Sequence, residues 1–284
     1  MILDDSILDT PERLSLRLRA LYAGAGLTRF RMMKFEEYDL YSRNKAFLPS
    51  DRIITFTDTS GELMALKPDV TLSIVKSTRQ GEAQRLYYAE SVYRVSPDAG
   101  AFREIHQVGV ELIGRAETAF CVSLAAESLK LVAKPHLLSL SHMALVNAAA
   151  HGEREIIRRM GRRSLHELND APDAAELIAL AGNIAEVLPR LEPLAARLGQ
   201  ESAYAELTEV ARLVPEAALD FSDVSDTGYY DGLLMKGFVE GVPQAVLAGG
   251  SYGGLMRRMG RTDSAVGFAV YLDRLERLEE VAVC

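Results

Sequence analysis

The chain contains 284 residues with a mass of 31.2 kDa, enough for one large domain or two small ones. It is 48% hydrophobic and 25% charged, and its apolar runs are far shorter than the roughly 20 residues that a membrane span requires. These values exclude a transmembrane protein and a disordered one. Its 40 acidic and 32 basic residues give a net charge of -8, the opposite of the charge that binds a phosphate backbone.

The first 18 residues carry acids where a signal peptide carries positive charge, so we expect a cytoplasmic protein. The two cysteines, Cys121 and Cys284, are too few for a disulfide framework or a cysteine metal cluster. The five histidines, at positions 106, 136, 142, 151 and 166, have no spacing typical of metal ligands. We therefore expect no metal and no cofactor.

The predicted elements begin with a helix over 11–23, with Thr10 as N-cap and Pro11 as its first residue. Strands are predicted, in chain order, over 30–35, 51–57, 63–66, 86–93, 104–113, 233–240, 245–247 and 266–271. Turn residues at 58–61 predict that the second and third of these form an antiparallel hairpin. Further helices are predicted over 69–76 and 272–280, and a turn at Gly249-Gly250.

Between residues 118 and 212, alanine and leucine recur at helical spacing. Strands at both ends with helices between them predict an α+β fold, with an antiparallel sheet flanked by helices. We expect one domain over 1–284 with a helical insertion at 115–220. Two interpretations of the insertion remain open: a surface for a partner, or a helical filler.

The run Gln107-Val108-Gly109-Val110-Glu111 carries the most informative polar pattern. Alternation in a strand places Gln107, Gly109 and Glu111 on one face. This face suits either a small polar ligand on the sheet surface or the solvent side of an antiparallel sheet. Arg94 and Arg274, each near a strand end, are either surface cations or clamps for a carboxylate or phosphate.

Three segments, in this order, resemble the core of a class II aminoacyl-tRNA synthetase, and specifically of histidyl-tRNA synthetases. LKPDVT at 66–71 is similar to the family's LRPEGT loop, which implies that Asp69 and Thr71 hold the amino group of the ligand. Segment 87–114 resembles the second class motif, with Gln107 and Glu111 at the histidine-contacting positions and Arg94 at its arginine. GGSYGG and the residues after it, 249–278, resemble the third motif, with Arg274 at its arginine.

The sequence departs from this pattern at positions and segments that handle ATP and tRNA in the synthetases. The signature RGLDYYTG of the synthetases appears here as SDTGYYDG, so Ser225 replaces an arginine that assists activation of the amino acid. Ala101 and Ser251 likewise stand where the family carries arginines. Serine and alanine supply no fixed positive charge to a developing adenylate. The chain also ends after the third motif, so we expect no anticodon-binding domain.

The sequence retains the motifs that bind an amino acid and lacks elements that handle ATP and tRNA in the synthetases. In this combination it resembles the ATP phosphoribosyltransferase regulatory subunit family. The resemblance implies a non-catalytic subunit that forms a hetero-oligomer with the catalytic ATP phosphoribosyltransferase subunit. It implies that this complex performs the first step of histidine biosynthesis and that free histidine is its feedback effector. It further implies a dimer and binding to neither tRNA nor membranes. The alternatives are a working histidyl-tRNA synthetase core, or an amino-acid-binding partner of another enzyme.

By position in these motifs, the resemblance implies a set of histidine-binding residues. They are Asp69, Thr71, Arg94, Gln107, Glu111, Tyr229, Tyr230 and Tyr252. It also implies a remnant of an anion or nucleotide site, formed by Arg94, Arg103 and Arg274. We expect no catalytic residue.

Overall fold

The computed structural model describes residues 7–44, 52–96, 100–115, 117–224, 229–276 and 278. Its strands are β1 (Thr28–Arg29), β2 (Phe35–Glu37), β3 (Thr55–Thr57), β4 (Leu63–Leu66), β5 (Gln84–Val95), β6 (Phe102–Ile113), β7 (His136–His142), β8 (Gly182–Asn183), β9 (Ala218–Leu219), β10 (Leu233–Val239), β11 (Leu247–Ser251) and β12 (Ala265–Tyr271). Its α-helices are α1 (Thr10–Gly24), α2 (Tyr38–Ser42), α3 (Thr71–Ser77), α4 (Thr118–Lys130), α5 (Met143–Ala149), α6 (Arg154–Gly161), α7 (Pro172–Ile178), α8 (Ile184–Arg197), α9 (Glu201–Leu213) and α10 (Gly253–Arg258).

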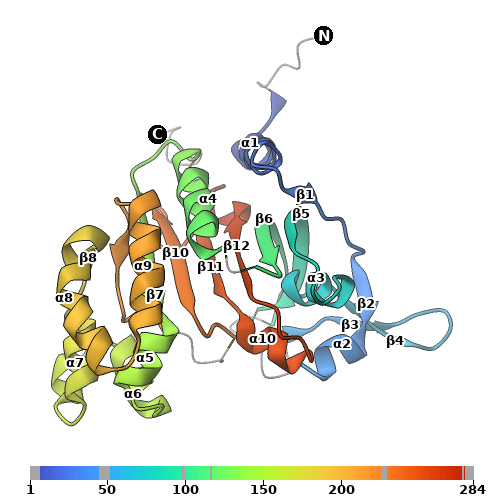
Figure 1. Ribbon diagram of the computed structural model, residues 1–284. Coiled ribbons are helices and arrows are strands. Elements are labelled where there is room, and N and C mark those ends of the chain that lie inside the picture. The colour runs from blue at the N-terminus through green and yellow to red at the C-terminus, as the bar shows by residue number, and fades with distance from the viewer. Residues whose placement is uncertain are drawn as a thin grey trace.

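A nine-stranded sheet in the order β1-β5-β6-β12-β11-β10-β7-β9-β8 runs through the molecule (Figure 1). Its pairs are antiparallel except β1 with β5 and β7 with β9, so the predicted antiparallel sheet is confirmed apart from two short parallel pairs. A second sheet, β2-β4-β3, contains the predicted hairpin. The fold class is α+β, as the order of elements predicted.

The two faces of the large sheet have different roles. One face packs against α1 and α4, where β6 contributes the buried side chains of Val108, Val110 and Leu112. The opposite face carries Gln107, Gly109 and Glu111, and a smaller core forms there with residues of α3 and α10. The predicted alternation in this strand is therefore confirmed. Gln107 and Glu111 are buried, so the solvent-face interpretation is wrong.

Several element boundaries differ from prediction. The N-cap of α1 is Asp9, not Thr10. The Asp9 carboxylate accepts from the amide of Glu12 and the Glu12 carboxylate accepts from the amide of Asp9, which together form a capping box. The predicted strand 30–35 is wrong because the chain crosses there from the large sheet to the small one, between β1 and β2. The predicted helix 272–280 begins as a 3₁₀ turn over Leu272–Arg274, and part of it lies outside the described residues.

Gly249 and Gly250 lie inside strand β11, so the predicted turn there is wrong. A Cβ at Gly249 would lie 2.2 Å from the carbonyl oxygen of Gly267, and one at Gly250 would lie 2.4 Å from that of Leu233. Close approach of neighbouring strands explains these glycines, because neither has a positive φ.

The segment 115–220 is not wholly helical. Its strand β7 pairs with β10 along seven residues, and α4 packs on the sheet, so both belong to the central layer. The remaining helices, α5 to α9, form a lobe at the far edge of the sheet, on the left of Figure 1. The helical prediction fails at β7 because a short apolar strand inside a long helical segment lacks a distinct periodicity.

Candidate functional site

A cavity of about 220 Å³ lies on the face of the sheet opposite α4, over β6, β11 and β12. This volume is below the roughly 300 Å³ at the lower end of sites for drug-sized ligands, so the cavity suits a small metabolite. The structure brings all eight predicted histidine-binding residues into its lining: Asp69, Thr71, Arg94, Gln107, Glu111, Tyr229, Tyr230 and Tyr252. These residues come from segments far apart in the sequence.

Glu111 is the charged centre of the cavity floor. Its side chain is buried, and its two carboxylate oxygens accept hydrogen bonds from the hydroxyls of Thr71 (2.7 Å) and Tyr252 (2.5 Å). Burial raises the pKa of Glu111 from 4.5 to about 7; the two hydroxyls oppose this shift, and the nearby carboxylate of Asp69 adds to it. Glu111 can therefore exchange a proton near neutral pH.

Asp69 and Arg94 form a second charged group in the cavity wall. Asp69 accepts from the amide of Leu72 at 2.8 Å, which fixes its carboxylate at the start of α3. The Nε of Arg94 donates to the carbonyl of Pro68 at 2.7 Å, and its Nη2 lies 3.8 Å from Asp69. The cavity thus offers a cation as well as two carboxylates. This combination suits a zwitterionic amino acid with a further hydrogen-bonding group.

Tyrosine rings form the remaining wall. The rings of Tyr229 and Tyr230 are 4.8 Å apart edge to face, and Tyr229 lies 6.1 Å from Tyr252. Burial raises the pKa of all three above the usual tyrosine value, so they remain neutral. The lining residues that were not predicted include two further tyrosines, Tyr88 and Tyr271. Tyr88 pairs with Gly109 and Tyr271 pairs with Gln107, so both lie on the face of the sheet that carries Gln107, and this pairing would have identified them.

The predicted anion-site arginines are only partly brought together. Arg94 and Arg103 are partners in the β5–β6 register, but Arg103 is exposed and its guanidinium lies 3.8 Å from Asp273. Arg274 donates to the carbonyl of Ala245, and its guanidinium stacks on the ring of Tyr271 at 4.1 Å. Of the three arginines, only Arg94 lines the cavity.

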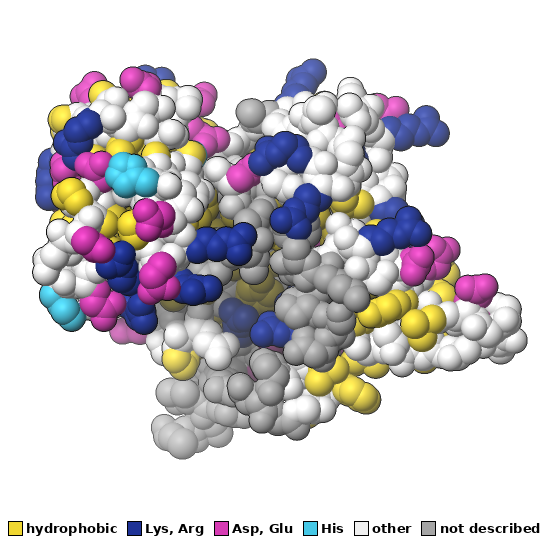
Figure 2. All heavy atoms as spheres, turned by 90° about the horizontal axis from the view of Figure 1, so that it is seen from below, with side chains coloured by type: hydrophobic (Ala, Val, Ile, Leu, Met, Phe, Trp, Pro, Cys, Tyr) yellow, Lys and Arg dark blue, Asp and Glu magenta, His cyan; other side chains and the backbone are white. Residues whose placement is uncertain are grey.

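A second hollow of about 460 Å³ lies between α9 and the ends of β10, β11 and β12, and Arg115 and Arg257 are its basic lining residues. Seen from below, several Lys and Arg side chains gather around the middle of the molecule (Figure 2). Arg257 pairs with Asp231 at 2.7 Å, and His142 pairs with Glu206 at 2.8 Å. His142 therefore ties α9 to the sheet. Ser251 lines this hollow, whereas Ser225 lies outside the described residues.

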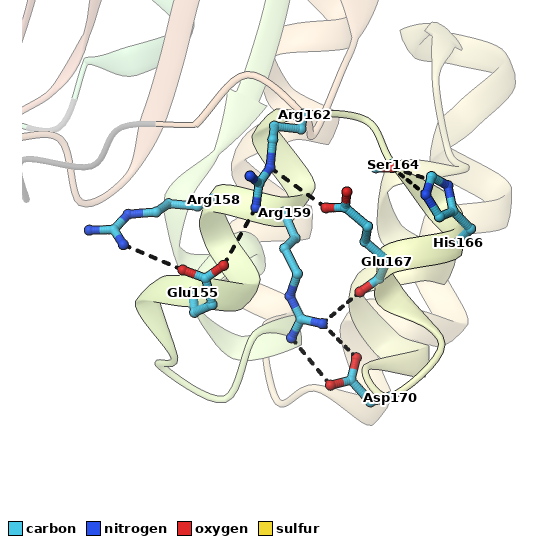
Figure 3. A network of polar contacts seen from close by, with 8 residues as sticks. All are labelled: Glu155, Arg158, Arg159, Arg162, Ser164, His166, Glu167 and Asp170. Atoms are coloured by element: carbon cyan, nitrogen blue, oxygen red, sulfur yellow. Dashed lines mark hydrogen bonds and ion pairs between the residues drawn. The ribbon is translucent and has the colours of Figure 1, made fainter.

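The arginines of α6 form a basic run, but acidic side chains neutralise it locally (Figure 3). Glu155 lies within 3.5 Å of both Arg158 and Arg162, and Arg159 contacts the carboxylate of Asp170 at 2.8 Å. The pairs of Glu155 with Arg158 and Arg162 are exposed, so each adds little to stability. Because Arg158, Arg159 and Arg162 already have acidic partners, these three are no ready site for phosphates. Among the described residues, no group of three or more side chains could hold a metal ion.

Comparison with known proteins identifies the family of the chain. The family model described as histidyl-tRNA synthetase matches residues 8–275. The ATP phosphoribosyltransferase regulatory subunit of Anaeromyxobacter dehalogenans is 30% identical over 92% of this chain and 84% of its own length. The chain belongs to the ATP phosphoribosyltransferase regulatory subunit family, within the histidyl-tRNA synthetase family. The regulatory subunit of Lactococcus lactis strain MG1363 is 26% identical, covering 94% of this chain and 91% of that protein.

Solved structures show the same fold. An ATP phosphoribosyltransferase regulatory subunit/histidyl-tRNA synthetase from Bacillus halodurans has a TM-score of 0.80 at 20% identity, covering 98% of this chain and 83% of that one. A chain of the Thermotoga maritima ATP phosphoribosyl transferase (HisG:HisZ) complex has a TM-score of 0.70 at 16% identity, covering 93% and 97%. The predicted synthetase-like fold is confirmed. No helix among the described residues is long and apolar enough to cross a membrane.

Proposed function

We propose that this chain is a non-catalytic regulatory subunit of ATP phosphoribosyltransferase and that free histidine binds in the 220 Å³ cavity. The observation that carries the proposal is a contrast between two sets of positions. The eight residues expected to bind histidine all line one cavity around Glu111, whereas positions 101, 225 and 251, where the synthetase pattern has arginines, carry alanine and serine. Such a pocket can bind an amino acid but lacks the cations that stabilise a developing adenylate.

In the proposed complex, Asp69, Thr71 and Gln107 hold the ammonium group of histidine. Glu111 and Tyr230 face the imidazole, and Tyr229 and Tyr252 form the walls. A buried carboxylate favours an imidazole N–H, and Asp69 supplies the charge that an ammonium group requires. Arg94 is the lining cation available to the ligand's carboxylate.

Regulation then requires histidine to bind one conformation of the hetero-oligomer better than another. A ratio of 5 to 150 in affinity corresponds to about 1 to 3 kcal/mol of coupling. In the structure, the hydroxyls of Thr71 and Tyr252 hold α3 and α10 to Glu111, and the carboxylate has acceptor sites left for an imidazole N–H. We infer that binding of the imidazole to the group that joins these two helices begins the conformational signal.

The test uses this chain mixed with the catalytic ATP phosphoribosyltransferase subunit of the same organism. We expect the two to co-purify, the chain to stimulate phosphoribosyl transfer, and histidine to inhibit the complex. Glu111→Gln should retain the stimulation and lose the inhibition. Equal activity with and without the chain would refute the proposal, and histidine-dependent pyrophosphate exchange with ATP would instead support a working synthetase.

We also propose that the complex is located in the cytoplasm. Within it, we propose that this chain forms a dimer. The outer side of the β2-β4-β3 sheet supports a protein contact, because Phe35 and Phe56 are both more than a third exposed. The Phe35 and Phe56 rings lie 5.5 Å apart and form one apolar patch. Light scattering of the native chain and of Phe56→Glu tests this: the variant should be monomeric at concentrations where the native chain is dimeric.

A further inference from the structure

Glycines occupy the sheet positions beside Glu111 on the cavity face. Glu111 pairs in register with Gly267 of β12, and Gly267 pairs with Gly250 of β11. Neither glycine has a positive φ, so backbone conformation does not require glycine at these positions. The lack of space for a side chain above these strands is therefore the remaining explanation for the two glycines.

At Gly267 that space is filled by the carboxylate of Glu111. A Cβ built on Gly267 would lie 2.0 Å from Oε2 of Glu111, 2.7 Å from its Cδ and 2.5 Å from the carbonyl oxygen of Val110. Protein interiors are close-packed, so any side chain at position 267 must displace this carboxylate. The Glu111 side chain therefore lies flat across β12 only because residue 267 has no side chain.

The position of the carboxylate decides its contacts. In the flat position, one oxygen accepts from Thr71 and the other from Tyr252, and the cavity above remains open. A raised carboxylate would leave both hydroxyls and occupy part of a cavity of only about 220 Å³. We propose that Gly267 is a positioning residue that sets the depth of Glu111 and thereby makes the cavity able to accept an imidazole. This inference rests on the proposed function for the identity of the ligand.

The first experiment measures histidine binding by calorimetry for the native chain and Gly267→Ala. We expect Gly267→Ala to raise the Kd for histidine about tenfold or more, because a hydrogen bond to a charged group is misplaced. The matched control is Gly237→Ala in β10, which β11 separates from β12. Its Cβ would meet Leu129 at 2.7 Å on the core side, away from the cavity. It should lower stability and leave the Kd unchanged.

The second experiment does not depend on histidine. Urea unfolding midpoints are compared for the native chain, Gly267→Ala, Glu111→Ala and the double variant. The contact of the new Cβ at position 267 with the Val110 carbonyl is present both in the native background and in the Glu111→Ala background, so its effect on the midpoint cancels in the comparison. If Gly267 acts through Glu111, Gly267→Ala lowers the midpoint less in the Glu111→Ala background than in the native one.

The outcomes separate the two proposals. Native-like histidine affinity in Gly267→Ala, or an equal loss of midpoint in both backgrounds, would overturn the role of Gly267. Absence of histidine binding by the native chain would refute the proposed ligand, while the unfolding comparison would still decide whether Gly267 positions Glu111. A crystal structure of Gly267→Ala should show the Glu111 carboxylate moved away from Tyr252.

Discussion

Glu111 combines burial, charge and two hydroxyl donors in a single residue. A carboxylate in such a place is stable only with partners, which Thr71 and Tyr252 supply from α3 and from the start of α10. Gln107 lies four residues earlier on the same face, and Asp69 and Arg94 form the charged wall of the cavity. Ligand recognition at this site is therefore a matter of a few polar atoms in an otherwise aromatic cavity.

The raised pKa of Glu111 predicts a pH dependence of stability. Between about 4.5 and 7 the folded protein keeps a proton that the unfolded chain has lost, so stability falls as pH rises, by at most about 1.4 kcal/mol per unit. Glu111→Gln removes this term. Urea unfolding at several pH values should therefore show the stability of the variant, relative to the native chain, rising across this window. A difference independent of pH would contradict the burial-raised pKa.

Arg94 is expected to contact the carboxylate of the ligand. Arg94→Ala should raise the Kd for histidine about tenfold, since a charge-assisted hydrogen bond is lost. Histidinol, which lacks the carboxylate, should bind the native chain and the variant equally well. The matched control is Arg103→Ala, the exposed register partner that does not line the cavity. Equal weakening of histidine and histidinol would show that Arg94 only supports the fold.

At the scale of elements, the cavity depends on short helices held by side chains from distant segments. Asp69 and Thr71 fix the start of α3, and Arg261 binds its end. The strand pairing at this site was predictable, because alternation in 104–113 is strong and a strand has only two faces. The placement of α3 against it was not, because the contacts that decide it come from residues almost two hundred positions later in the chain.

Removal of the Arg261 contacts should destabilise the protein strongly. Arg261 is 7% exposed and donates to the carbonyls of Val75 and Thr78, both at 3.0 Å, and to Asp263 at 2.8 Å. Arg261→Ala leaves the Asp263 carboxylate, whose side chain is 8% exposed, without its ion-pair partner and with the Gly81 amide as a remaining donor, so the free energy of unfolding should fall by about 3 to 5 kcal/mol.

Arg257→Ala provides the control for Arg261. Arg257 pairs with Asp231 at 2.7 Å, but its side chain is 66% exposed, so its removal should cost at most about 1 kcal/mol. Denaturant unfolding measures both variants under the same conditions. Similar losses for the two would show that burial does not set the strength of the Arg261 contacts.

For the whole molecule, one sheet carries a hydrophobic core on one face and a polar cavity on the other. The lobe formed by α5 to α9 adjoins the sheet edge, and Arg158, Arg159 and Arg162 in and after α6 pair with acidic side chains of the same lobe (Figure 3). The net charge of -8 is thus not offset by a free basic patch on α6. A small ligand that joins several segments of such a molecule stabilises all of them together.

Histidine should therefore raise the Tm of the isolated chain. At a hundred times the Kd, ligand binding stabilises a protein by about 2.7 kcal/mol, which corresponds to a shift of roughly 5 °C for a chain of this size. Scanning calorimetry should show this shift for histidine and none for lysine, and Glu111→Gln should abolish it. A Tm unaffected by histidine would contradict the proposed site.

The sequence by itself determined the fold class, the main strands and eight of the residues that line the cavity, because alternation, turn residues and three collinear motifs are local patterns. Only the tertiary structure decided which of these residues meet. It brought Arg94 into the cavity and left Arg103 and Arg274 outside, and it placed β7 within the sheet. It also decided that Gly267 lies beneath Glu111. Contacts between strands depend on register and packing, which link residues far apart in the chain and leave no periodic signal within it.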